Sequence, residues 1–156
     1  MKLRPDLLPS DLDAPANEFA LPQGIIGFPQ YRRAELLYLP DHLPFLWMHL
    51  RGEAPRDIVR FIVIEPGGVV PGYEPELYEV DVQSLALTSP REAMILNIVT
   101  LQRETPVEAT VNLVGPIVIN RRSRVGRQVV IANHALHTTR HPLVENSQAP
   151  EVAVSR

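Results

Sequence analysis

Three histidines near the end of the chain, His134, His137 and His141, have the residue type and spacing that favour metal binding. Imidazole is a common ligand of zinc and other transition metals. On a helix, separations of three and seven residues place all three rings along one face. The run NHALHTTRH holds no carboxylate, however, and Thr138 and Thr139 weaken a helix there. Both a metal site and a solvated segment remain open interpretations of this triplet.

A second group with possible chemistry is the arginine cluster Arg121, Arg122, Arg124 and Arg127, which crowds one expected turn. The planar guanidinium group holds phosphate well, so this turn is a candidate RNA contact. The cluster lacks the interleaved aromatic residues that support a nucleic-acid surface. A solvated hairpin tip explains the same residues. The alternative function that follows from the cluster is a small β-barrel RNA-binding protein that uses this turn.

Five acidic residues stand close together in one stretch, Glu65, Glu74, Glu76, Glu79 and Asp81, and the sequence has no lysine or arginine between positions 61 and 90. Such a stretch attracts a basic partner and repels nucleic acid. Tyrosines 73 and 78 flank it, and tyrosine is frequent in protein interfaces. We therefore predict a partner-binding surface that contains Tyr73, Glu74, Glu76 and Glu79. A solvated acidic face is the competing interpretation.

Other residues that could carry catalysis form no recognisable site. The sequence has no cysteine, which excludes disulfides, thiolate zinc sites and thiol nucleophiles. Ser84, Ser89 and Ser123 lie in no G-x-S-x-G motif, and no phosphate-binding G-K-[ST] motif occurs. We therefore expect a protein that is not an enzyme and needs no cofactor. A metal-dependent enzyme built on the histidine triplet is the third hypothesis.

The overall charge and hydropathy indicate a soluble, cytoplasmic protein. The net charge is only −3, so no global field draws the chain to nucleic acid or to a membrane. The N-terminus lacks an apolar run of secretory-signal length. No stretch has the roughly 20 apolar residues that span a bilayer. We expect protein partners, with no direct contact to nucleic acid or membrane.

The elements that would position these residues are mostly strands. Sixteen prolines, roughly double the average usage, favour short strands and disfavour a helical bundle. Gly115 and Pro116 interrupt an apolar run, which predicts a corner where a strand changes direction. A short helix over 81–87 with Asp81 as N-cap is expected, and a second could begin near Asn133. The predicted strands are 45–51, 58–64, 94–101, 108–114, 117–120 and 127–132.

These elements predict a mainly β fold, a small antiparallel β-barrel or sandwich with one or two short helices. Residues 1–17 and 144–156 are rich in polar residues and proline without a sustained period, so we expect a flexible N-terminal arm and a flexible C-terminal tail. The β domain then covers residues 18–143.

Several segments of the chain carry motifs that together point to a protein family. The most specific are TVNL at 110–113 and PIVIN at 116–120, which follow an IVT strand at 98–100. Others are GIIGF at 24–28, PFLW at 44–47 and FIVIEP at 61–66. With these motifs, residues 18–143 of the chain resemble the bacterial FliW family of flagellar assembly factors. The positions that we assign to the family motifs, with structural roles, are Gly27, Phe28, Phe45, Pro66, Asn112, Pro116 and Asn120.

The resemblance implies a small β-barrel that binds other proteins and performs no chemistry. In that family the partners are flagellin, held before export, and CsrA, an RNA-binding translational repressor. Sequestering CsrA frees flagellin messenger RNA for translation, and accumulating flagellin releases CsrA again. The main functional prediction is thus a flagellin-binding chaperone and CsrA antagonist. The acidic stretch would then face CsrA.

Overall fold

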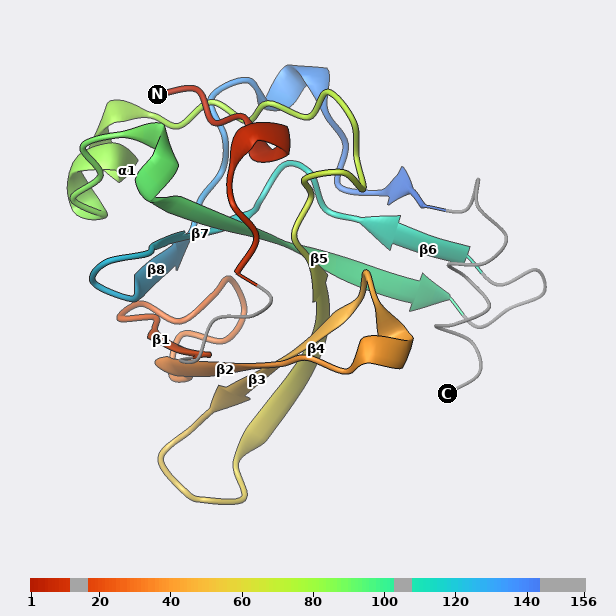
Figure 1. The fold of residues 1–156 in the computed structure, drawn as a ribbon. Helices are drawn as coiled ribbons and strands as arrows, with labels where there is room; N and C mark the ends of the chain where they lie inside the picture. Colours follow the sequence, from red (N-terminus) through yellow and green to blue (C-terminus); the bar gives the residue numbers. More distant parts are fainter. Residues whose placement is uncertain (12–16, 103–107, 144–156) are drawn as a thin grey trace.

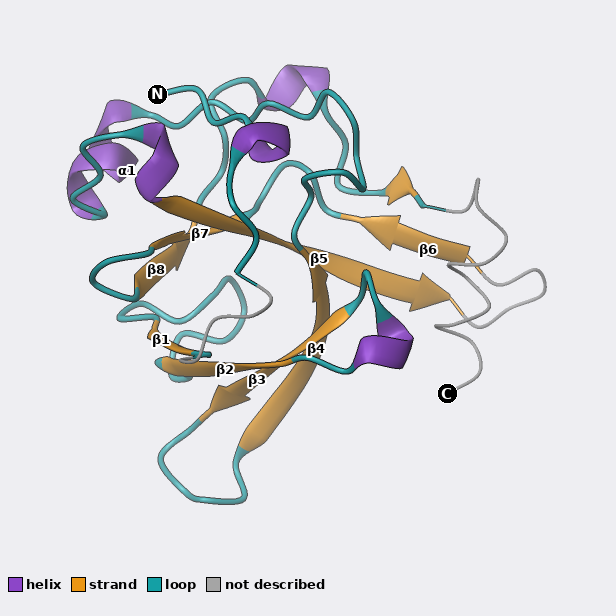
Figure 2. Ribbon diagram, in the orientation of Figure 1, coloured by secondary structure: helices purple, strands orange, loops and turns teal. Residues whose placement is uncertain are grey.

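The protein is represented by a computed structural model that describes residues 1–11, 17–102 and 108–143 (Figure 1). Strands predominate in these ranges, and the α-helix α1 is short (Figure 2). The strands are β1 (Glu18–Ala20), β2 (Arg33–Leu37), β3 (Leu46–Arg51), β4 (Ile58–Ile64), β5 (Ala93–Gln102), β6 (Glu108–Val111), β7 (Ile117–Asn120), β8 (Val125–Gln128) and β9 (His141–Pro142). The helical elements are α1 (Glu79–Ser84) and the 3₁₀ turns η1 (Pro5–Leu7), η2 (Pro40–His42), η3 (Pro90–Glu92) and η4 (His134–Leu136). Within the described residues, no helix has the length and apolar character needed to cross a membrane.

The strands close into a seven-stranded barrel in the order β4-β3-β2-β1-β8-β7-β5, with β5 returning to β4. All these pairings are antiparallel except the short contact between β1 and β8, where Ala20 pairs with Val125 in parallel. Closure removes unpaired sheet edges within the ring. Strands β6 and β9 continue the sheet beyond β5. The predicted mainly β barrel is therefore confirmed.

The corner predicted at Gly115 and Pro116 lies in the connection between β6 and β7, residues 112–116, which bulges away from β5. Strands β6 and β7 pair with the same edge of β5, and residues 112–116 stand opposite only residues 97 and 98. The carboxamide of Asn112 closes the bulge, because its Oδ1 accepts hydrogen bonds from the amides of Val114 and Gly115 at 3.0 and 2.9 Å. The bulge lets one chain segment change direction while it stays paired to β5.

Alternate residues of the barrel strands fill the interior, which we call the inner core. On β5, for example, Met94 and Leu96 point inward and are fully buried. Strand β8 contributes Gly126, where an added Cβ would lie 2.7 Å from Cγ1 of Ile119, so a larger residue would collide with the core. The inner core consists of Phe19, Leu21, Ile25, Tyr31, Ala34, Leu36, Leu46, Met48, Leu50, Val63, Met94, Leu96, Ile117 and Ile119.

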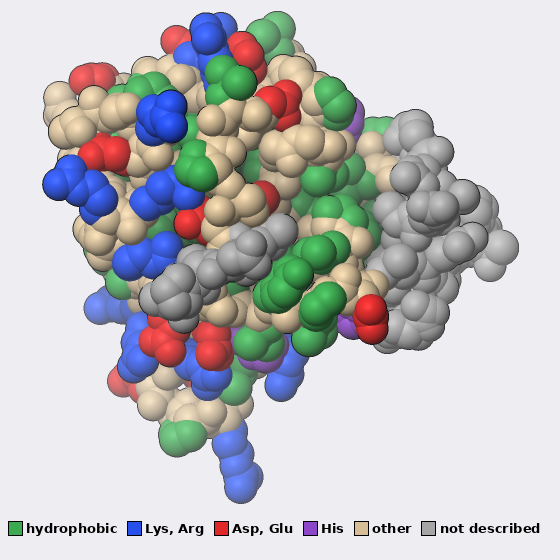
Figure 3. Space-filling model, viewed as in Figure 1, with side chains coloured by type: hydrophobic (Ala, Val, Ile, Leu, Met, Phe, Trp, Pro, Cys, Tyr) green, Lys and Arg blue, Asp and Glu red, His purple; other side chains and the backbone are tan. Residues whose placement is uncertain are grey.

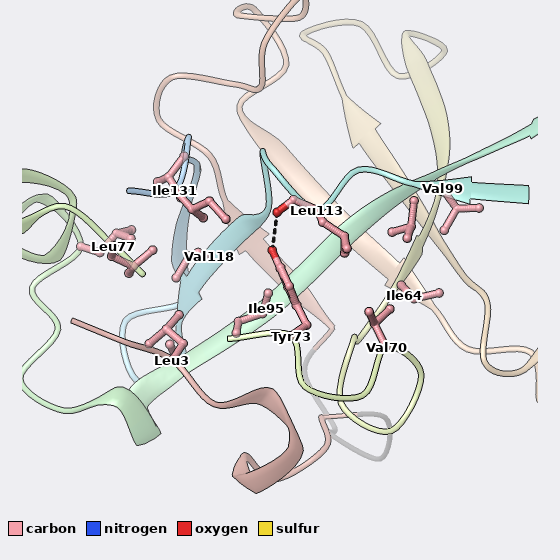
Figure 4. Packing of buried hydrophobic residues seen from close by; sticks show 14 of the residues in the cluster. Leu3, Ile64, Val70, Tyr73, Leu77, Ile95, Val99, Leu113, Val118 and Ile131 are labelled. Atoms are coloured by element: carbon pink, nitrogen blue, oxygen red, sulfur yellow. Dashed lines mark hydrogen bonds between the residues drawn. The ribbon is translucent and has the colours of Figure 1, made fainter. Parts of the chain in front are cut away.

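The outer face of β5 to β7 is buried as well, beneath segments that are largely not strands. Residues 1–8, 66–88 and 129–138 fold over this face and form what we call the outer core (Figures 1 and 4). Because both faces of β5 and β7 are covered, these strands carry continuous apolar runs. The outer core consists of Leu3, Phe45, Ile64, Val70, Tyr73, Leu77, Val82, Leu85, Leu87, Ala93, Ile95, Val99, Ala109, Val111, Leu113, Val118, Val129 and Ile131.

The element predictions differ from the structure mainly at the ends of elements. The strands at 58–64 and 117–120 are confirmed, whereas the last predicted strand, 127–132, is displaced to β8 at Val125–Gln128. The expected helix exists as α1, but it begins two residues earlier, and Asp81 lies inside it rather than at its N-cap. The helix expected near Asn133 is a single 3₁₀ turn. Strands β1 and β2 escaped prediction because both are short and carry charged residues.

The first 11 residues differ from the predicted mobile arm, because they are packed against the barrel. Leu3 is fully buried in the outer core, and its amide donates a hydrogen bond to the carbonyl of Pro75 at 2.9 Å. Met1 and Leu77 exchange two backbone hydrogen bonds at 2.7 and 3.1 Å. Burial of Leu3 and Pro5, together with these hydrogen bonds, holds the segment on the barrel. Residues 12–16, and the tail predicted at 144–156, lie outside the described residues.

Candidate protein-binding surface

Two chain segments, residues 76–81 of the acidic stretch and residues 127–132, run side by side in opposite directions. The amide of Ala132 donates to the carbonyl of Glu76 at 2.6 Å, and Nε of Arg127 lies 3.7 Å from Oδ1 of Asp81. Between these contacts, the inward side chains of both segments belong to the outer core. The exposed side chains of the two segments lie on their solvent side: alternate residues up to Tyr78, and then consecutive residues where α1 begins.

Five exposed side chains of these two paired segments lie around the start of α1, and we call them the α1 surface: Glu76, Tyr78, Glu79, Val80 and Val130. Tyr78, Val80 and Val130 are 46%, 66% and 48% exposed. Glu76 and Glu79 are exposed, and neither carboxylate forms an ion pair with any described residue. The surface thus combines free negative charge with apolar area.

Tyr73 was predicted to lie at this surface, and that prediction is wrong. Its side chain is only 2% exposed and belongs to the outer core (Figure 4). The hydroxyl donates to the carbonyl of Leu113 at 2.7 Å and accepts from Nδ2 of Asn97 at 3.3 Å. Burial raises the pKa of the Tyr73 hydroxyl to about 12. The edge of its ring meets His137, with centroids 5.1 Å apart. Tyr73 is therefore a structural residue.

The other acidic residues of the stretch differ from Glu76 and Glu79 in having partners. Glu74 is half-buried, and its carboxylate lies 3.9 Å from Nζ of Lys2 and 4.0 Å from Nε of Arg4. Glu65 accepts hydrogen bonds from the Ser10 hydroxyl and the amide of Asp11. Asp81 is buried beside Arg127. The negative charge that remains available to a partner is concentrated at Glu76 and Glu79.

The arginine cluster forms contacts within the protein. The guanidinium of Arg121 binds Asp11 and the carbonyls of Pro9 and Ala93. Arg122 reaches Glu92 at 2.9 Å, and Arg127 donates to Ser84 at 3.0 Å. Nε of Arg124 lies 3.4 Å from the carbonyl of Glu18. These contacts hold the turn and the N-terminal segment in place. On the face seen in Figure 3, positive and negative side chains are interspersed.

The histidine triplet does not form a helical face. His134 begins η4, His137 follows it in extended backbone, and His141 lies in β9. Among the described residues, no group of three or more His, Asp or Glu side chains is arranged to hold a metal ion. Burial and the nearby His141 lower the pKa of His137. His137 packs on Tyr73 instead, so the spacing in sequence did not translate into a shared ligand geometry.

The residues assigned to family motifs lie at turns and in packed positions. Asn120 donates from Nδ2 to the carbonyls of Leu85 and Ala86, and its Oδ1 accepts from the amides of Arg122 and Ser123. Three of the other motif residues, Phe45, Pro66 and Pro116, are buried. Phe28 meets Tyr31 and Phe61 edge to face. Gly27 has a φ of +90°, which glycine adopts without strain. Asn112 closes the bulge described above.

A cleft of ≈ 610 Å³ lies between the N-terminal segment and the turn after β4. Pro5, Leu8 and Val69 line it, together with Arg121 and Glu65. Arg121 and Glu65 are engaged with the N-terminal segment, through Asp11 and Ser10. The third charged lining residue, Asp6, accepts hydrogen bonds from the amides of Gly68 and Gly72. The cleft therefore offers apolar walls, and its charged lining residues are already bonded within the protein, unlike the carboxylates of the α1 surface.

Sequence analysis missed Val80 and Val130 as surface residues. Val130 lies in the β-branched run VVI at 129–131, in which any residue could face inward. Val80 stands between two acidic residues, Glu79 and Asp81, which is a weak signal of exposure at the start of a helix. Only the packing of Val129 and Ile131 into the outer core shows that Val130 faces outward.

Comparisons with known proteins point to one family. The family model described as "FliW protein" matches residues 11–143. The flagellar assembly factor FliW of Geotalea uraniireducens is 34% identical over 137 residues, covering 87% of this chain and 80% of the relative. That of Moorella thermoacetica is 29% identical over 140 residues, covering 90% and 86%. A crystal structure of the flagellar assembly factor FliW superimposes with a TM-score of 0.68 at 30% identity, covering 83% of this chain and 87% of that one.

Proposed function

This chain belongs to the FliW family of flagellar assembly factors, and we propose that it acts in the cytoplasm by stoichiometric protein binding. In this proposal the protein holds flagellin before export and sequesters the translational regulator CsrA. The observation that carries the proposal is the α1 surface, where Glu76 and Glu79 are exposed and unpaired beside apolar side chains. Such a surface supports recognition of a protein rather than catalysis.

The regulatory logic of the proposal is partner exchange by mass action. A protein that binds two partners in exclusive complexes responds to their relative concentrations. When unexported flagellin accumulates, it occupies this protein and CsrA is released. Free CsrA then represses synthesis of flagellin. No turnover is required at any step, because occupancy alone transmits the signal.

We assign the α1 surface to CsrA because of charge complementarity. An RNA-binding protein presents a basic surface to phosphate. Exposed carboxylates attract such a surface over long range, and the effect weakens as salt is added. Of the residues predicted from the sequence, Glu76 and Glu79 fit this assignment. Glu74 adds charge but is tied to the N-terminal segment through Lys2 and Arg4.

The test is charge reversal at the two free carboxylates. We expect Glu76→Lys with Glu79→Lys to lower the affinity for purified CsrA about tenfold or more at low salt. The matched control is Asp41→Lys with Glu53→Lys, which changes the net charge equally at exposed positions outside the α1 surface. Isothermal titration calorimetry of both variants measures the effect. Unchanged affinity in the α1 variant would show that CsrA docks elsewhere.

A second measurement tests the exchange itself. Purified monomeric flagellin is added to a preformed complex with CsrA, and release of CsrA is followed by size-exclusion chromatography. The proposal expects free CsrA to appear in proportion to added flagellin. A stable ternary complex would contradict exclusive binding.

Direct RNA binding by the Arg121–Arg127 turn has less support, because each of these arginines already contacts another group of the protein. A flagellin leader RNA offered to the wild-type protein distinguishes the two functions. Specific RNA binding that is lost in Arg122→Ala would favour this alternative.

A further inference from the structure

The apolar side chains of the α1 surface are exposed although the backbone beneath them is firmly held. Tyr78, Val80 and Val130 belong to neither core. Yet Leu77, next to Tyr78, is 2% exposed, and its amide and carbonyl both bond to Met1. The neighbouring Ala132 amide is bonded to Glu76. A surface with a fixed backbone loses little conformational entropy on binding, which favours affinity.

The charged residues next to Tyr78 in its own segment are carboxylates. Glu76 and Glu79 stand on either side of Tyr78 in the chain. Lys2 lies opposite Glu76 in an isolated β-bridge, but its Nζ lies 3.9 Å from the carboxylate of Glu74, and Arg127 lies close to Asp81. The α1 surface therefore has an apolar centre and a rim where the carboxylates of Glu76 and Glu79 form no ion pair with a described residue. This is the arrangement in which the centre supplies binding energy and the rim selects the sign of the partner's charge.

We propose that Tyr78, Val80 and Val130 are the anchors of the α1 surface, and that they bind an apolar patch rimmed by lysine or arginine on a partner protein. This inference rests on the proposed function and deepens it by dividing the work between anchors and rim. The anchors determine how long the complex lasts. The carboxylates determine how fast it forms and how strongly it depends on salt.

Charge also argues against other occupants of the same surface. A second copy of this chain, docked about a twofold axis through this surface, would bring the two negative surfaces together. Such like charges oppose association unless they are paired. Nucleic acid and anionic lipid carry the same sign as the rim and are repelled as well. A basic protein is the occupant that fits both the centre and the rim.

The experiment compares anchor and rim variants with purified CsrA as the probe. We expect Tyr78→Ser to weaken binding about tenfold or more, at both low and high salt, through faster dissociation. Val80→Ser and Val130→Ser should weaken it less. Glu76→Gln with Glu79→Gln should slow association at low salt and have little effect at high salt. Surface plasmon resonance at two salt concentrations separates the two rates.

The matched control is Leu136→Ser, because Leu136 is 77% exposed and lies on η4, outside the α1 surface. All the substituted side chains are exposed, so thermal unfolding should verify that each variant stays folded. Equal loss of affinity in Leu136→Ser and Tyr78→Ser would overturn the inference. So would wild-type affinity in all three anchor variants, which would leave the proposed function standing.

Three further outcomes decide between this inference and its alternatives. If the wild-type protein does not bind CsrA, the proposed function fails, and this inference fails with it. If sedimentation shows a dimer that Tyr78→Ser dissociates, the surface binds a second copy and the inference is wrong. A salt-independent loss in the anchor variants, with a salt-dependent loss in the rim variant, supports it.

Discussion

The inner core and the outer core bury the same kinds of side chain, but different kinds of chain segment build them. Barrel strands enclose the inner core, and each is paired on both sides in the closed ring. The outer core lies between the sheet and a cover of loops, 3₁₀ turns and α1. The cover is tied down by a small number of specific hydrogen bonds, such as those of Asn120 to Leu85 and Ala86.

This difference teaches where a rigid protein can place a recognition surface. Both neighbouring strands fix the register of a barrel strand, whose inward side chains must stay in the inner core. The cover has no such constraint, so its sequence is freer to vary on the solvent side. The α1 surface is the solvent side of this cover. Packing of Leu77, Val129 and Ile131 holds it in place.

The largest expected effect is in the inner core. Leu96→Ala should lower the free energy of unfolding by about 3–5 kcal/mol, because the closed barrel cannot collapse into the space left by the side chain. Leu96 is fully buried on β5. Urea denaturation measures the change. A loss below about 2 kcal/mol would mean that the barrel relaxes more easily than its closed ladder implies.

Leu77→Ala makes the corresponding change in the outer core. We expect a smaller loss of about 2 kcal/mol, because the cover can move toward the space. Hydrogen exchange should speed up at Leu3 and Leu77, whose amides bond within this cover, before it does in β5. If Leu77→Ala costs as much as Leu96→Ala and exchange rises uniformly, the two cores form one cooperative unit.

The buried hydroxyl of Tyr73 tests the polar ties of the outer core. Tyr73→Phe leaves the carbonyl of Leu113 without this donor and should cost about 1–2 kcal/mol. Tyr78→Phe is the matched control and should cost almost nothing, because Tyr78 is 46% exposed. Thermal and urea unfolding measure both. Equal costs would show that the Tyr73 hydroxyl contributes no net stability.

Tyr73 should also make the free energy of unfolding depend on pH in the alkaline range, because its pKa is raised in the folded protein. The folded protein keeps the proton to about pH 12, whereas the unfolded chain loses it near pH 10. Stability should therefore fall as the pH rises from 10 towards 12. The wild-type protein should show a steeper fall than Tyr73→Phe. Parallel curves for the two proteins would contradict a buried, neutral hydroxyl.

The smallest expected effect is at Glu92 in η3, which accepts hydrogen bonds from Thr88 and Arg122. These bonds lower the pKa of Glu92 from 4.5 to about 2. Its contribution to stability is present above pH 4.5 and is lost as the pH falls towards 2. Glu92→Gln should flatten this part of the acid unfolding curve. An unchanged acid curve would show that the bonds to Thr88 and Arg122 are too exposed to matter.

The strands of the barrel were largely predictable because hydrophobic periodicity is a local property. The β-branched run at 58–64 and the run at 117–120 gave both element type and bounds. The break at Gly115 and Pro116 located the corner. The short strands β1 and β2 were not predictable, since their pairing, rather than their own residues, makes them strands.

The candidate site was predictable only in part. The local excess of carboxylates pointed to the right stretch of chain, and Glu76 and Glu79 are exposed as expected. Which carboxylates have partners could not be deduced, because the partners are distant in sequence. Glu65 binds the segment around Ser10, and Glu74 lies beside Lys2 and Arg4. The same holds for the arginines, whose contacts reach as far as Asp11.

The sequence by itself determined a mainly β chain, its acidic stretch and its resemblance to the FliW family. Only the tertiary structure decided that Tyr73 is a core residue and that Tyr78 is a surface residue. The two tyrosines stand five positions apart in a segment that contains proline and has no regular period. Their directions follow from how this segment covers the outer face of β5, where the buried Tyr73 hydroxyl finds partners at Leu113 and Asn97. A contact between residues so distant in the chain leaves no local signal in the sequence.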